Sequence, residues 1–190
     1  MESPNKLPKV STVNGTDDRE ALLKHWYVAL VQMNCEKTAD KRLQSMGIET
    51  FLPVQTEIHY WSDRKKKIDR IVIPTMVFVK LNSEEMKKVR NVSFVYKLLT
   101  APGENVPAII PEAQINQFKF MLGNSDSEIT LEPLPVQKGD MVRVKRGSLR
   151  GLTGYASNGS DGKSKILVVI DYLGCACVSI SLTDLEIVNK

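Results

Sequence analysis

The chain has 190 residues, of which 42% are apolar and 25% charged, and its formal net charge is +4. This composition is typical of a folded, water-soluble protein and excludes a chain that is disordered throughout. No apolar run approaches the ~20 residues that span a bilayer, and residues 1–20 contain no apolar stretch of signal-peptide length. We therefore expect a cytoplasmic protein that does not bind membranes.

Basic residues outnumber acidic ones in two blocks. Residues 25–122 hold 14 basic against 10 acidic side chains and residues 133–190 hold 8 against 5, whereas 123–132 hold three acids and no base. Two such blocks suit two modules that each approach a polyanion, because phosphates attract lysine and arginine whatever the sequence. Solvated surface charge explains the excess equally well. We expect a linker at 123–132 and, because residues 1–24 lack apolar periodicity, a flexible tail there.

A strand and a helix are predicted at the start of the first block. The apolar run from Trp26 to Met33 suits a strand buried on both faces, and Asn34 offers an N-cap to the next helix. Gly47 suits the left-handed backbone that ends a helix. Between them, apolar side chains recur at the spacing of one helical face: Cys35, Ala39, Leu43 and Met46.

A long β-hairpin is predicted next. Residues 48–53 and 55–61 are of β-type, and the polar basic turn 62–67 and a third strand at 68–73 follow them. The hairpin would therefore carry positive charge at its tip.

The remaining elements of the first block follow Pro74. They are a strand at 76–81, a short helix capped by Ser83 and ending at Arg90, a strand at 94–99 and a helix at 111–122 stopped by Gly123. This alternation predicts an α+β domain at 25–122, with helices packed on a mainly antiparallel sheet.

The second block, residues 133–190, has a different texture. Short runs rich in valine and isoleucine alternate with glycine-rich turns, which predicts a small all-β, SH3-like barrel. Its first run has Val142 and Val144 inward and Arg143 outward. The surrounding pattern resembles the KOW motif, whose residues here are Gly139, Asp140, Val142, Val144, Gly147, Gly151 and Gly154.

With that motif in view, the first block resembles the N-terminal domain of the NusG family. The resemblance is carried by Trp26-Tyr27-Val28, Phe51-Leu52-Pro53, and Pro74 with Val77-Phe78-Val79. It implies an elongation or antitermination factor that binds the clamp helices of RNA polymerase and acts without a cofactor, as a monomer. The barrel of such proteins contacts Rho or a small-subunit ribosomal protein, and the sequence leaves open which of them, if either, is the partner here.

The resemblance places the polymerase-binding pocket at Leu30, Ile73, Met76 and Phe78, because apolar side chains line a groove that receives a helix. Ile73 and Phe78 fit ordinary sheet core equally well. Ile73 and Met76 also replace two aromatic residues that are usual in the family. The less aromatic pocket favours a specialised paralogue, and the polar N-terminal extension and basic hairpin resemble those of antiterminators at capsule and exopolysaccharide loci.

The hairpin tip is the candidate nucleic-acid contact. Its cations are Arg64, Lys65, Lys66, Lys67 and Arg70. Such side chains neutralise phosphates of upstream duplex DNA, the non-template strand or nascent RNA at little geometric cost. A solubilising turn is the equally plain alternative.

No catalytic or metal site is predicted. Residues 157–164 end in Gly-Lys-Ser like a phosphate-binding loop, but the first glycine is missing and a β-pattern replaces the required helix. The cysteines Cys35, Cys175 and Cys177 lack metal-site spacing and are expected to stay reduced. The alternative function is a ribosome-associated or general RNA-binding protein of the KOW type, with Arg143, Lys145 and Arg150 on RNA.

Overall fold

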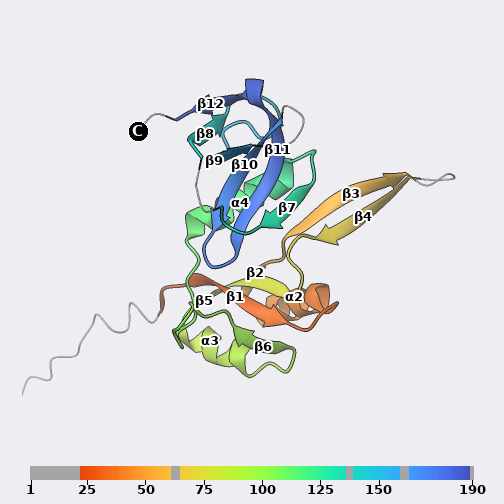
Figure 1. The fold of residues 1–190 in the computed structure, drawn as a ribbon. Coiled ribbons are helices and arrows are strands. Elements are labelled where there is room, and N and C mark those ends of the chain that lie inside the picture. Colours follow the sequence, from red (N-terminus) through yellow and green to blue (C-terminus); the bar gives the residue numbers. More distant parts are fainter. Residues whose placement is uncertain (1–21, 61–64, 136–138, 159–162, 189–190) are drawn as a thin grey trace, which may run out of the picture.

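The structure, a computed structural model, describes residues 22–60, 65–135, 139–158 and 163–188. It contains an N-terminal α+β part and a C-terminal all-β part, which confirms the predicted fold class (Figure 1). Every strand pair in it is antiparallel.

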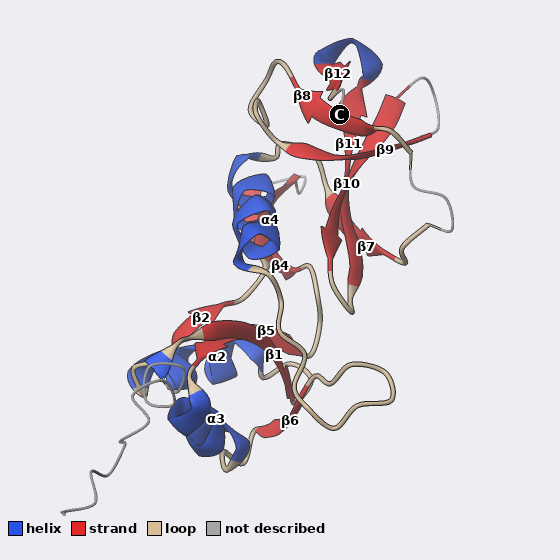
Figure 2. Cartoon of the chain, turned by 90° about the vertical axis from the view of Figure 1, so that its left-hand side faces the viewer, coloured by secondary structure: helices blue, strands red, loops and turns tan. Residues whose placement is uncertain are grey.

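The N-terminal part is built on a four-stranded sheet in the order β2-β5-β1-β6. These strands are β1 (His25–Val31), β2 (Glu49–Phe51), β5 (Met76–Leu81) and β6 (Val95–Leu98). The helices α2 (Glu36–Ser45) and α3 (Ser83–Arg90) lie on one side of the sheet and α4 (Glu112–Asn124) on the other (Figure 2). Both sheet faces are therefore covered, as the apolar run that begins at Trp26 predicted.

Alternation along β1 divides its side chains between two cores. Tyr27, Ala29 and Val31 pack with residues of α2 and α3, such as Leu43 and Val89. The side chains on the other face of β1 pack against α4 instead. Trp26 and Val28 pack in a larger cluster with Phe78 of β5 and with Ile115, Phe118 and Met121 of α4.

A two-stranded hairpin extends from the N-terminal part. It consists of β3 (Val54–Tyr60) and β4 (Lys65–Ile71), paired from Val54–Ile71 to Tyr60–Lys65. The hairpin projects away from the sheet (Figure 1). The long hairpin is confirmed, but residues 65–67, predicted to lie in its turn, belong to β4, which ends at Ile71 and not at 73. Residues 61–64 lie outside the described part.

The C-terminal β-domain is a six-stranded sheet in the order β12-β8-β9-β10-β11-β7, with a short 3-10 helix at Leu182–Asp184. Its strands are β7 (Ile129–Glu132), β8 (Met141–Val144), β9 (Thr153–Asn158), β10 (Lys163–Ile170), β11 (Gly174–Ser181) and β12 (Leu185–Ile187). Strand β7 lies inside the segment expected to be a linker, and β12 had no predicted counterpart. Pairing of β7 with β11 draws the connecting segment into the sheet.

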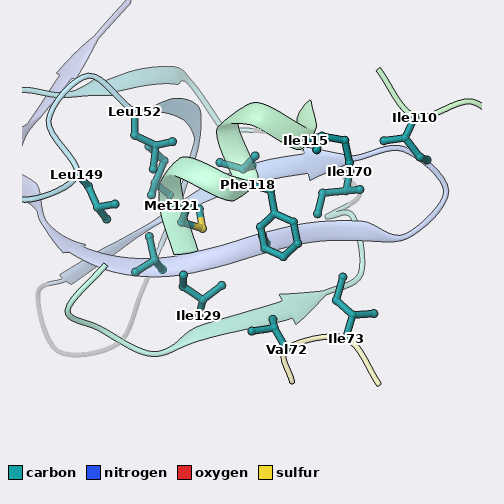
Figure 3. Packing of buried hydrophobic residues seen from close by; sticks show 14 of the residues in the cluster. Val72, Ile73, Ile110, Ile115, Phe118, Met121, Ile129, Leu149, Leu152 and Ile170 are labelled. Atoms are coloured by element: carbon teal, nitrogen blue, oxygen red, sulfur yellow. The ribbon is translucent and has the colours of Figure 1, made fainter. Parts of the chain in front are cut away.

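The two parts share one apolar core. The cluster that begins at Trp26 and Phe78 continues without a break through α4 into the β-domain, where Ile129, Ile166 and Ile170 belong to it. Figure 3 shows Phe118 and Met121 of α4 among side chains of the β-domain, such as Ile129 and Ile170, with Val72 and Ile73 on the far side of Ile129. Helix α4 therefore packs on both parts at once.

Three predicted helix ends were wrong. Asn82, not Ser83, caps α3, because its side chain accepts a hydrogen bond from the Glu85 N–H while the Glu85 carboxylate accepts one from the Asn82 N–H. Asn34 has φ +63° and does not cap α2, whose N-cap is Cys35. Helix α4 continues through Gly123 to Asn124, since packing of its apolar side holds the last turn.

Candidate docking site

An apolar strip, formed by Leu30 and Met76, lies where β1 ends and β5 begins. The two residues face each other in the antiparallel register, and both side chains are half-buried. They lie on the same sheet face as Val28 and Phe78, because residues two apart on a strand point the same way. The apolar strip is thus the accessible rim of the second core.

Ile73 and Phe78, the other residues predicted to line the docking pocket, lie in the core and not at the surface. Their exposed fractions are 2% and 0%. The Phe78 ring stacks on Phe51 with 5.6 Å between ring centroids, and Phe118 of α4 meets it edge-on at 6.3 Å. A partner can touch the apolar strip directly, whereas Ile73 is buried in the core and Phe78 is covered by Phe118 of α4.

A strained turn leads into the apolar strip. Thr75 has φ +62°, in the left-handed region that a β-branched residue rarely adopts. Its carbonyl accepts a hydrogen bond of 2.8 Å from the Val31 N–H, and its own N–H donates one of 2.8 Å to Oε1 of Glu36. These two bonds hold the turn against the end of β1 and the start of α2.

Two polar side chains, the Gln55–Arg70 latch, join the hairpin to the β-domain. Gln55 is 5% exposed; its Nε2 donates to the Ser127 carbonyl at 2.8 Å and its Oε1 accepts from the Ile129 N–H at 2.9 Å. Arg70 donates to the Ile129 carbonyl at 2.9 Å and to Gln55 Oε1 at 3.1 Å, and it pairs with Glu57. Contact of Arg70 with nucleic acid stays a prediction, but its guanidinium already has these partners.

The family of the chain follows from comparison with known proteins. A family model described as "Transcription termination factor nusG" matches residues 24–119, just over half of the chain. The chain belongs to the NusG family. The match includes the apolar strip, the strained turn and the hairpin, and it ends within α4.

One solved structure agrees with this NusG-family fold. A structure described as "Domain interaction in Thermotoga maritima NusG" superposes with a TM-score of 0.50 at 20% identity, covering 89% of this chain and 99% of that one. The MjSpt4:Spt5 complex in conformation B gives a TM-score of 0.28 at 13% identity, covering 87% and 97%. The comparison with curated proteins found no match.

The cations of the NusG-family hairpin differ in their surroundings. Lys66 and Lys67 are exposed on β4. Lys65 is the first residue of that strand, whereas Arg64 lies outside the described residues. Nearby, hydrogen bonds from Lys37 and Thr56 hold the pKa of Asp69 below its ordinary value. Lys66 and Lys67 are thus the tip cations that the described structure leaves in solvent.

The residues of the KOW-like motif form the first corner of the β-domain. Val142 and Val144 are buried and Arg143 is exposed, as the alternation predicted. Gly139 and Asp140 precede β8, Gly147 and Gly151 have φ +84° and +92°, and a Cβ at Gly154 would lie 2.5 Å from the Leu167 carbonyl oxygen. A side chain at Gly154 would therefore collide with the neighbouring strand.

The two thiols of the β-domain are buried side by side. Cys175 and Cys177 lie with their Sγ atoms 3.6 Å apart, and burial raises the pKa of both. Among the described residues no three histidine, cysteine or acidic side chains gather at a possible metal position. Residues 159–162 lie outside the description, but β9 and β10 pair on either side of them. No helix of the described ranges is long and apolar enough to cross a bilayer.

Proposed function

We propose that this NusG-family protein is a transcription elongation or antitermination factor whose N-terminal domain, residues 25–122, binds the clamp helices of RNA polymerase. The apolar strip is the contact surface, and Ile73 and Phe78 support it from the core. The C-terminal β-domain recruits a second factor, for which Rho and a small-subunit ribosomal protein are the candidates. This role needs binding surfaces and no catalytic group.

The observation that carries the proposal is the pairing of Leu30 with Met76 at the open end of the second core. Two adjacent, half-buried aliphatic side chains give a helix an apolar surface to pack against. Pro74 beside them is exposed, and so is Met33, which is 65% exposed just after β1. The site is aliphatic where aromatic residues are usual, which supports a specialised paralogue such as those of polysaccharide operons.

Binding of the isolated clamp-helix hairpin to the full-length protein tests the proposal. Met76→Asp places a charge against the apolar partner and should weaken binding at least about thirtyfold. Met46→Asp is the matched control, because Met46 is also accessible, at 46% exposed, but lies at the C-cap of α2 on the other side of the sheet. Equal affinities of the two variants would contradict the proposed site.

The hairpin supplies the proposed nucleic-acid contact. Lys66 and Lys67 are exposed on a strand that projects from the sheet, so they can approach upstream or non-template DNA beside a docked polymerase. Replacing both with glutamine should reduce the salt dependence of DNA binding while leaving the affinity for the clamp-helix hairpin unchanged. Residues Arg64 and Lys65 extend the same cationic segment.

A candidate recruitment surface lies at the end of the β-domain. A hollow of about 500 Å³ there is lined in part by Leu182, Leu185 and Ile187. Leu182 and Ile187 are 58% and 63% exposed, so an apolar partner can bury both. Leu182→Glu should abolish recruitment of the second factor without affecting polymerase binding.

One observation favours the RNA-binding alternative. Arg143, Lys145 and Arg150 line a common hollow of the β-domain. If this surface carried the main function, RNA affinity would fall steeply with salt and would survive Met76→Asp. Loss of polymerase binding with retained RNA binding in that variant would separate the two functions.

A further inference from the structure

Glu36 is a buried carboxylate with an unusual location. It is 3% exposed, and it is one of three buried polar or charged residues of the described structure, with Gln55 and Ser164. A buried charge is costly unless hydrogen bonds or opposite charge compensate it. In the described part of the chain, no lysine or arginine lies within ion-pair distance of Glu36.

The compensation comes from backbone. Glu36 is the first residue of α2, where the helix dipole and unpaired N–H groups favour a negative charge. Its Oε1 also accepts the Thr75 N–H at 2.8 Å, across 39 positions of sequence. The carboxylate therefore joins the start of α2 to the strained turn that precedes the apolar strip.

This bond acts on a backbone conformation that would otherwise be unfavourable. A threonine at φ +62° persists only where its surroundings hold it. Two hydrogen bonds do so here: the Val31 N–H donates to the Thr75 carbonyl, and the Thr75 N–H donates to Glu36. The next residue, Met76, takes its place opposite Leu30 directly after this turn.

We propose that Glu36 is a positioning residue for polymerase docking: by binding the Thr75 N–H it fixes the turn that places Met76 beside Leu30. This inference rests on the proposed function of the apolar strip. It assigns to Glu36 a role in affinity, because loss of the bond frees the turn and makes the partner order it on binding.

The test compares binding of the clamp-helix hairpin by full-length variants. Glu36→Asp keeps an acid at the first helical position but withdraws the acceptor from Thr75, and Glu36→Ala removes it. Both should raise Kd about tenfold, as expected for loss of a hydrogen bond to a charged group. Adding Thr75→Gly to Glu36→Asp should restore most of the affinity, because glycine adopts positive φ without help.

Two measurements separate positioning from general stabilisation. Amide exchange at Thr75 should be slow in the wild type and fast in Glu36→Asp. The matched control is Glu85→Ala, which removes another glutamate that accepts a backbone N–H in the first turn of a helix, but in α3. This control should lower stability while leaving Kd unchanged.

The outcomes distinguish the two proposals. If the wild type does not bind the hairpin, the proposed function fails. If it binds and folded Glu36→Asp has the same Kd, or if exchange at Thr75 stays slow in that variant, the positioning role is wrong and the proposed function stands.

Discussion

The two faces of the N-terminal sheet are closed in different ways. The face with Tyr27, Ala29 and Val31 is covered by α2 and α3, and its cluster stays within the N-terminal part. The face with Trp26 and Phe78 is covered by α4 and continues into the β-domain. The first face is a core of the N-terminal part alone, whereas the second links residues of both parts that lie more than a hundred positions apart. The apolar strip lies at the open end of the second face.

The largest expected loss of stability follows from truncating a central side chain of either face, and the two faces should differ in how far that loss spreads. Phe118→Ala should cost about 3–5 kcal/mol, and Leu43→Ala about 2–5 kcal/mol, because both side chains are fully buried. The distinguishing measurement is amide exchange. Phe118→Ala should speed exchange in both the sheet and β10, whereas Leu43→Ala should leave β10 unchanged. Unchanged amide exchange in β10 for both variants would show that the two parts do not share a core.

The hydrogen bonds of the Gln55–Arg70 latch also join the N-terminal part to the β-domain, and their contribution to stability can be measured. Gln55→Ala leaves the Ser127 carbonyl and the Ile129 N–H without their partner, so we expect a loss of about 2 kcal/mol in urea unfolding. Thr56→Val removes only the hydroxyl of an exposed neighbour and should change stability by less than about 0.5 kcal/mol. Similar losses in the two variants would rule out a contribution of the latch.

Relief of the strained turn at Thr75 should increase the stability of the protein. Thr75→Gly relieves a left-handed β-branched residue and should stabilise the protein by about 1 kcal/mol, raising Tm by about 2–4 °C. Asn34→Gly is the control at nearly the same φ, +63°, where asparagine is tolerated and the gain should be close to zero. A drop in Tm for Thr75→Gly would show that the turn is not strained.

The smallest expected change in stability comes from the ion pair between Lys165 and Glu132 in the β-domain. The hydrogen bond from Lys165 holds the pKa of Glu132 below its ordinary value. The stabilisation is therefore complete above the unfolded pKa of ~4.3 and is lost as pH falls through the lower folded value. Lys165→Met should cost less than about 1 kcal/mol at pH 7, since both side chains are partly exposed, and nothing at pH 2. If the stability of Lys165→Met differed from that of the wild type by the same amount at both pH values, the ion pair would not be the cause of the difference.

Local patterns predicted the elements whose partners are close in sequence. The alternation of Val142 and Val144 and the positive φ of Gly147 and Gly151 follow from rules that act over a few residues, and the structure has them. The helix of Ala39 and Leu43 is confirmed for the same reason.

Features that depend on distant partners were missed. Strand β7 alternates apolar and polar residues over only four positions of an acidic segment, which is too short to predict a strand, and it is completed by pairing with the edge of β11. The hydrogen bonds of the Gln55 and Glu36 side chains had no sequence signal, since each is made to a backbone group at least 39 positions away. Likewise, nothing in the pattern decided whether Ile73 and Phe78 were surface or core.

The most direct test of the apolar strip is a titration of methyl-labelled protein with the clamp-helix hairpin, observed by NMR. We predict saturable shifts at the Leu30 and Met76 methyl groups, with Met46 and Met141 unchanged. No saturable shift, or shifts confined to Met141 and the rest of the β-domain, would contradict docking through the N-terminal sheet.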